Sequence, residues 1–275
     1  MRILVLLGET PSSVAARRYA FHLARDMNAE VTGLAGVDLS FIEAPMAGGL
    51  GTTAYKVRLE EQLKKQAEDA RRRLHEAFAA ECEAQGLPPG WLSFDGDPMD
   101  ALHIAAETRD LIVTGHDTAF HGDMREPLPE NLGKLLSTMP RPVIVCGDEP
   151  PAGRDVLIAY DGSLPAMRAV HMFALLGIAR DRRIHVTSVD PDQELAARRT
   201  SGAASLLRGY GYQVNPIPIP TSAHVSDVLK IQVADHGIGT LVMGAYGHGG
   251  WRKFLFGSTT GTLAEEPPCA LFLYH

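Results

Sequence analysis

The chain has 275 residues, of which 45% are hydrophobic and 21% charged, a composition typical of a folded protein with one large domain or two ordinary ones. The formal net charge of −7 gives no basic surface for nucleic acid or an anionic membrane, and no apolar run is as long as a membrane-spanning helix. Three widely spaced cysteines, Cys82, Cys146 and Cys269, indicate reduced thiols in a cytoplasmic protein rather than a disulfide framework.

Strands and helices alternate along the first half of the chain. Apolar, β-branched runs predict strands buried on both faces, and apolar residues at helical spacing predict the helices between them. The hydroxyls of Ser12 and Ser13 mark the expected start of the first helix, and Gly115 the end of a later strand. In chain order, the predicted segments are strand–loop–helix–strand at 2–38, a glycine-rich loop at 47–53, a long helix at 54–86, helix and strand at 97–117, and helix and last strand at 132–147.

The second half repeats this order, with Ser163 at its first helix start and a shorter middle helix at 193–211. A repeat of this length indicates a duplicated domain rather than a solenoid. The sequence therefore predicts an α/β fold with two tandem open, mostly parallel sheets and helices on both faces. The expected boundaries are a first domain at 1–147, a proline- and glycine-rich linker at 148–153, and a second domain at 154–275.

One segment of the second half carries a pattern suited to phosphate. Gly244 is expected at a strand end, Gly247 follows in a turn, and Gly257 precedes the hydroxyls of Ser258 and Thr259 at a helix start. Glycines let backbone N–H groups approach a ligand, and a helix start adds unpaired N–H donors with partial positive charge. The pattern is neither a Walker motif nor a Rossmann fingerprint.

The spacing Gly244-x2-Gly247-x9-Gly257-Ser258, with Asp161 at the end of the half's first strand, resembles the ATP-binding signature of the universal stress protein family. The resemblance extends over the amino-acid sequence of 154–275. In the first half it is limited to the order of strands and helices. It implies a tandem protein of the adenine nucleotide alpha hydrolase-like fold, paired as a homodimer or a tandem pseudo-dimer, that binds ATP or another adenine nucleotide, with or without magnesium. Such a protein would act as a nucleotide-dependent regulator or switch in the stress response.

The resemblance also implies roles for single residues. Asp161 would lie by the ribose or adenine, and the backbone of Val189 would face the adenine edge. The remaining residues would contact the phosphates, through backbone atoms or at the helix start: Gly244, Gly247, His248, Gly257, Ser258 and Thr259. No catalytic residue is assigned.

The first half lacks this pattern. Asp161 falls opposite Gly8, and Gly257-Ser258 falls opposite about Glu130-Asn131, where a carboxylate would repel a phosphate. We therefore expect only the second half to bind nucleotide.

Two alternative functions stay open. His248 could act on a phosphate in a slow ATP-hydrolysing enzyme, and the first half with the 54–86 helix could serve a ligand-free interaction protein.

A polar loop in the first half contains possible metal ligands, namely His116, Asp117, His121 and Asp123. Imidazole and carboxylate together suit zinc or a similar ion. The favoured interpretation is a solvated polar loop with no metal.

Overall fold

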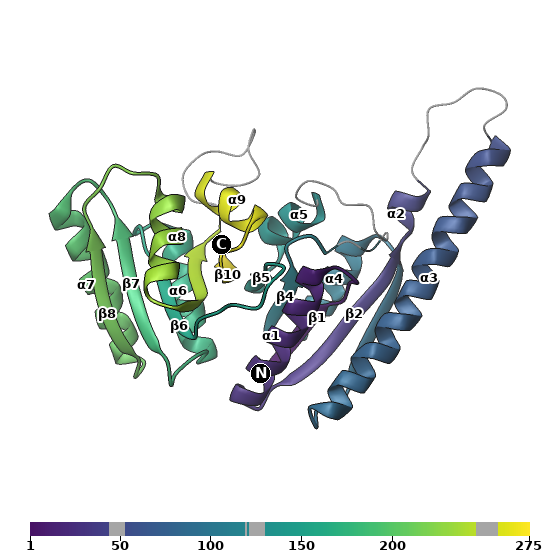
Figure 1. Cartoon of the computed structure of the whole chain (residues 1–275), viewed down its shortest axis with the longest axis horizontal. Helices are drawn as coiled ribbons and strands as arrows, with labels where there is room; N and C mark the ends of the chain where they lie inside the picture. Colours follow the sequence, from purple (N-terminus) through teal and green to yellow (C-terminus); the bar gives the residue numbers. More distant parts are fainter. Residues whose placement is uncertain (44–52, 119, 121–129, 246–257) are drawn as a thin grey trace.

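The computed structural model describes residues 1–43, 53–118, 120, 130–245 and 258–275. These residues form a ten-stranded sheet with helices on both faces (Figure 1), in the order β3-β2-β1-β4-β5-β10-β9-β6-β7-β8. Neighbouring strands run parallel, except that β10 pairs with β5 antiparallel.

The first half supplies one side of the sheet. Its elements are β1 (Arg2–Leu6), α1 (Pro11–Met27), β2 (Glu30–Asp38), α2 (Leu39–Ile42), α3 (Thr53–Ala84), β3 (Gly90–Gly96), α4 (Pro98–Ala106), β4 (Leu111–Gly115), α5 (Glu130–Thr138) and β5 (Val143–Cys146). The second half supplies the other side. Its elements are β6 (Asp155–Ala159), α6 (Leu164–Leu176), β7 (Arg183–Val189), α7 (Gln193–Gly209), β8 (Gln213–Ile219), α8 (Val225–Asp235), β9 (Ile238–Gly244), α9 (Ser258–Glu265) and β10 (Ala270–Tyr274).

The two halves have the same strand order when each is followed outward from the β5–β10 pair. The predicted α/β fold with mostly parallel strands in each half is therefore confirmed. The structure adds that the two sheets join edge to edge, because Leu271, Phe272 and Leu273 of β10 pair with the residues of β5. The predicted loop at 47–53 falls almost entirely outside the described residues.

Matched caps begin the first helix of each half. In the second half the Ala166 N–H donates to Ser163 Oγ at 3.3 Å, so the predicted helix start at Ser163 is confirmed. In the first half the Ser13 N–H donates to Thr10 Oγ1 at 3.3 Å, and α1 starts at Pro11. The predicted start at Ser12 or Ser13 was wrong, because Pro11 fits the first turn of a helix and Thr10 caps it.

The core has two layers, one on each face of the sheet. One layer packs α1, α3, α6 and α7 against the strands, and the other packs α4, α5, α8 and α9. This two-sided burial explains why the two strands at the middle of the sheet, β5 and β10, are apolar at all their buried positions. In the described part of the chain, all three cysteines are buried free thiols. None of the described helices is both long enough and apolar enough to cross a bilayer.

Candidate functional site

The carboxyl ends of β6, β7 and β9 lie at one edge of the sheet in the second half, where open parallel sheets bind their ligands. Asp161 lies two residues beyond β6 and its side chain is exposed. Its Oδ1 atom accepts the Ser163 N–H at 2.9 Å, and this bond fixes the carboxylate beside the start of α6. The structure therefore places Asp161 beside the start of α6, and its contact with a nucleotide stays a prediction. We call the region between these strand ends and the starts of α6 and α9 the crevice of the second half.

The backbone of Val189 faces the same crevice. The Asp190 N–H donates to the Ile219 carbonyl at 3.2 Å, so the polar groups of Asp190 point toward β8. In a strand, the backbone N–H and C=O groups of successive residues point toward opposite neighbouring strands. Those of Val189 therefore point toward β6. The last β6–β7 bond runs from the Tyr160 N–H to the Thr187 carbonyl at 2.8 Å. Val189 lies beyond it, and among the described residues no backbone group pairs with its N–H or C=O.

An ion pair that the sequence analysis missed borders this crevice. Arg199 of α7 donates from Nη1 to Asp190 Oδ2 at 2.7 Å, and both side chains are partly buried. The Arg199 side chain passes Gly162, whose φ of 79° suits glycine. Burial raises the pKa of the Tyr160 phenol; the Asp161 charge raises it further and the Arg199 charge lowers it. No sequence motif marked Arg199, because its contact depends on how α7 packs.

Gly244 lies where β9 approaches the start of α6. A Cβ atom added to Gly244 would lie 2.5 Å from the Ala166 nitrogen and 2.7 Å from the Pro165 carbonyl carbon. Gly115 has the same relation to α1 in the first half, where an added Cβ would lie 2.7 Å from the Ser13 nitrogen. Close packing of each strand end against a helix start therefore requires glycine at both positions, whether or not a ligand binds.

The first turn of α9 lies next to the end of β9. Thr260 is buried, and its Oγ1 atom is 3.5 Å from the Gly244 carbonyl oxygen. Thr259 is half-buried on the same turn, and Ser258 is the first residue of α9. The predicted phosphate-binding residues Gly247, His248 and Gly257 lie outside the described residues.

The alignment of α5 with α9 differs by one residue from the sequence prediction. Leu135 and Leu136 of α5 are buried, as are Leu263 and Ala264 of α9. Matching these pairs places Glu130 opposite Ser258 instead of Gly257. The first residue of α5, Glu130, therefore corresponds to the first residue of α9, Ser258.

The equivalent crevice of the first half contains its own polar side chains. Thr10 donates to Asp117 Oδ1 at 2.8 Å, and Ser12 donates to the same oxygen. The Ser13 hydroxyl bonds to Thr118 Oγ1 at 2.9 Å, and the Gly115 N–H donates to that hydroxyl at 3.0 Å. The segment after β4 thus covers the start of α1.

The same segment also covers the end of β2. The Asp38 N–H donates to the Phe120 carbonyl at 3.2 Å, and the buried Phe120 ring packs edge-on against Phe94 at 5.0 Å between centroids. The first-half crevice is therefore filled by the protein's own residues between Asp117 and Phe120. The expectation that only the second half binds nucleotide stays a prediction.

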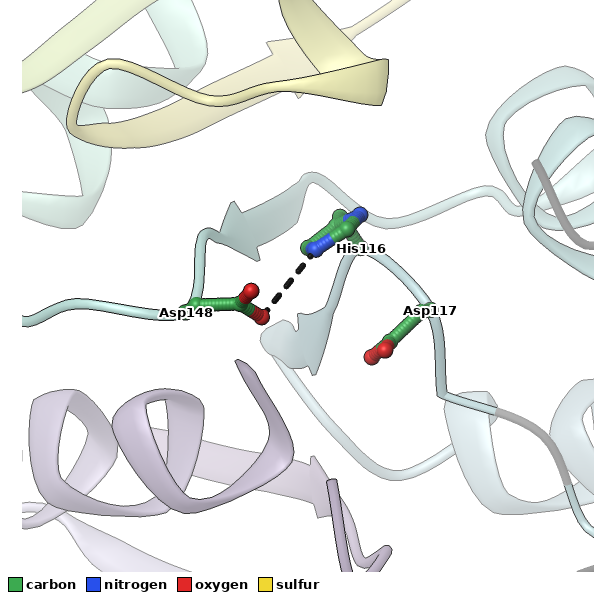
Figure 2. Close-up of side chains that lie close together, drawn as sticks. All are labelled: His116, Asp117 and Asp148. Atoms are coloured by element: carbon green, nitrogen blue, oxygen red, sulfur yellow. Dashed lines mark hydrogen bonds and ion pairs between the residues drawn. The ribbon is translucent and has the colours of Figure 1, made fainter. Parts of the chain in front are cut away.

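The structure brings two of the four candidate metal ligands together with a residue that the sequence did not suggest. The ligand atoms of His116, Asp117 and Asp148 lie within 4.8 Å of one another (Figure 2). His116 Nε2 is 3.3 Å from Asp148 Oδ1, and Asp117 already accepts two hydroxyl bonds. Asp148 lies two residues beyond the end of β5, and no spacing rule linked it to His116 and Asp117. His121 and Asp123 lie outside the described residues.

Comparisons with known proteins agree with this fold. No protein-family model matches the chain. The universal stress protein Slr1230 of Synechocystis is 25% identical over 173 residues, which is 61% of this chain and 58% of that relative's length. A universal stress protein from Archaeoglobus fulgidus has a TM-score of 0.71 at 18% identity, covering 99% of this chain and 97% of that one. A protein of unknown function from Pseudomonas aeruginosa has a TM-score of 0.58 at 16% identity, covering 99% and 92%.

Proposed function

We propose, from the premise that the chain belongs to the universal stress protein family, that it binds one adenine nucleotide, such as ATP, in the crevice of its second half. The observation that carries the proposal is the difference between two matched crevices. In the first half, Asp117 and Phe120 occupy the helix start and the strand end. In the second half, no described residue bonds to the Val189 backbone, and Asp161 stands where the first half has Gly8.

Each end of the crevice suits a different part of a nucleotide. The Asp161 carboxylate can accept a hydrogen bond from a ribose hydroxyl, and the Val189 N–H and C=O form a donor–acceptor pair suited to the edge of adenine. At the other end, the first turn of α9 offers unpaired N–H groups and the positive end of the helix dipole to phosphate. Thr259 adds a hydroxyl on that turn.

A regulatory role follows from binding only if nucleotide favours one conformation over another. The crevice joins β6, β7 and β9 to α9, which lie in the half of the sheet that pairs with β5 through β10. Nucleotide bound there contacts elements that continue to the junction of the two halves. We therefore favour a nucleotide-dependent regulator of the stress response. The alternative of slow ATP hydrolysis depends on His248, and no observation on the described residues favours it.

Calorimetric titration of the full chain with ATP tests the proposal, with mass analysis of nucleotide released on denaturation. One site per chain is expected. Asp161→Ala should raise the Kd about tenfold or more, since it removes a hydrogen bond to a charged acceptor. Asp235→Ala, at an exposed position at the end of α8, is the matched control and should leave the Kd unchanged. No ATP binding by the wild type, or two sites per chain, would contradict the proposal.

A second variant tests the phosphate end. Ser258→Glu places a carboxylate at the first residue of α9, where the aligned first-half residue is Glu130. The fold already accommodates a carboxylate at that position in the first half, so the far-UV spectrum should stay that of the wild type. Binding of ATP should be lost, because the carboxylate repels phosphate. Wild-type affinity in this variant would place the phosphates elsewhere.

A further inference from the structure

A cavity of about 940 Å³ lies between the two halves, away from the nucleotide crevice. Its walls come from α1, from the linker around Pro150 and Pro151, and from the loop that follows α6. Val156 and Thr240 line it near the starts of β6 and β9. It therefore lies at the amino ends of these parallel strands, whereas the crevice lies at their carboxyl ends.

The charged residues that line this cavity are mostly arginines. Arg18, Arg154, Arg180 and Arg182 outnumber the two carboxylates, Asp26 and Asp181, by four to two, in a chain whose net charge is −7. Arg182 pairs with Asp181 at 3.3 Å and with Asp26 at 3.7 Å. Within the described part of the chain, the other three arginines make no ion pair. The cavity thus keeps an excess of positive charge.

The rest of the wall is largely apolar. Leu23 and Ile178 are buried there, one from each half. Tyr19 also lines it, and its hydroxyl bonds to Thr240 Oγ1 at 2.8 Å across the two halves. Burial raises the pKa of the Tyr19 phenol, so this group stays neutral. Guanidinium groups over apolar walls are the combination that binds an anionic group attached to an apolar body.

We propose that this cavity binds a small molecule that carries a carboxylate or phosphate on an apolar body. Arg18 from α1 and Arg154 from the start of the second half would hold the anion from two sides. The apolar body would lie against Leu23 and Ile178. Because Arg18 and Leu23 belong to the first half and Arg154 and Ile178 to the second, the bound molecule links the two halves. The inference does not depend on nucleotide binding.

Three naphthalene compounds separate the charge from the apolar body: 1-naphthyl phosphate, 1-naphthoate and 1-naphthol. Each is titrated by calorimetry into the full chain, first without nucleotide and then with saturating ATP, so that binding of the probe in the nucleotide crevice can be recognised. We expect both anions to bind about tenfold or more tightly than the neutral naphthol. The stronger of the two anions identifies phosphate or carboxylate as the preferred group.

Charge-reversal variants locate the binding. Arg18→Glu and Arg154→Glu should each weaken the anions about tenfold or more and leave naphthol unchanged. Arg58→Glu, at an exposed arginine on α3, is the matched control and should bind like the wild type. Equal binding of anions and naphthol would overturn the proposal, as would equal affinities in all three variants. Loss of anion binding on addition of ATP would overturn it too, because the probe would then occupy the nucleotide crevice.

Discussion

Gly244 stands in the glycine pattern that suggested a phosphate site, yet its surroundings predict a structural role. Replacing it by alanine would put a Cβ atom 2.5 Å from the Ala166 nitrogen and 2.7 Å from the Pro165 carbonyl carbon. Real Cβ atoms keep more than 3.0 Å from such neighbours. Both neighbours are backbone atoms in the first turn of α6, so relief requires the helix start or the strand end to move.

Overpacking of this kind costs about 1–3 kcal/mol. Since rigid backbone lies on the far side of the contact, we expect Gly244→Ala to lower the free energy of unfolding by about 2 kcal/mol. For a chain of this size the melting temperature should fall by about 5 °C. Urea unfolding followed by circular dichroism, without nucleotide, measures the first quantity, and a thermal scan measures the second.

Two other glycines serve as controls. Gly202→Ala in α7 meets nothing within 4 Å and should stabilise the protein by about 0.5–1 kcal/mol, because alanine favours a helix interior. Gly115→Ala repeats the clash in the first half, against Ser12 and Ser13, and should destabilise like Gly244→Ala. If Gly244→Ala unfolds like the wild type and loses only ATP affinity, the packing argument is refuted and this glycine serves the ligand.

The remaining predictions concern the described side chains. Glu81→Gln should lower the free energy of unfolding, measured in urea, by about 2 kcal/mol, because it leaves the largely buried Arg17 guanidinium without its carboxylate. A loss near zero would mean that water replaces the carboxylate. Burial lowers the pKa of His185, so its contribution to stability is present above the unfolded pKa of about 6.5 and is lost as pH falls through the lowered value. His185→Asn should flatten the loss of stability between about pH 7.5 and about pH 5, whereas the same change at the exposed His171 should not. Protein purified without a histidine tag should contain substoichiometric zinc by mass spectrometry, because Asp117 is already held by two hydroxyls; one zinc per chain would refute this.

Much of the fold could be predicted because its signals are local. Apolar runs mark β1, β4, β6 and β9 through burial on both faces, and Ser163 marks a helix start through its own hydroxyl. Asp161 could be placed for the same reason, since it follows a strand whose end defines the crevice.

The strand β8 shows where local signals fail. Its sequence QVNPIPI contains two prolines, which are rare in the middle of a sheet. Ile219 accepts the Asp190 N–H and Ile217 accepts the Thr187 hydroxyl, so these odd-numbered residues face β7. Pro216 and Pro218 therefore turn their nitrogens away from β7, at the outer edge of the sheet, where no N–H is needed. The two prolines are tolerated because β8 is the outermost strand, a position that its own sequence does not reveal.

The filled crevice of the first half could not be predicted either, because it depends on contacts between residues far apart in the chain. Asp117 bonds to Thr10 across more than a hundred residues, and Phe120 reaches the end of β2. In the sequence this segment read as a polar loop with candidate metal ligands. The structure instead gives Asp117 hydroxyl partners and joins His116 to Asp148.

The β5–β10 pair gives a physical reason for keeping a half whose crevice is filled by its own residues. Leu271, Phe272 and Leu273 of β10 are at most 1% exposed, and β10 pairs with β9 on one side and β5 on the other. Without the first half, β10 would be an exposed apolar edge strand, which promotes association with other chains. The first half can therefore fill its own crevice and still be needed, because it covers the edge of the half that we propose binds nucleotide.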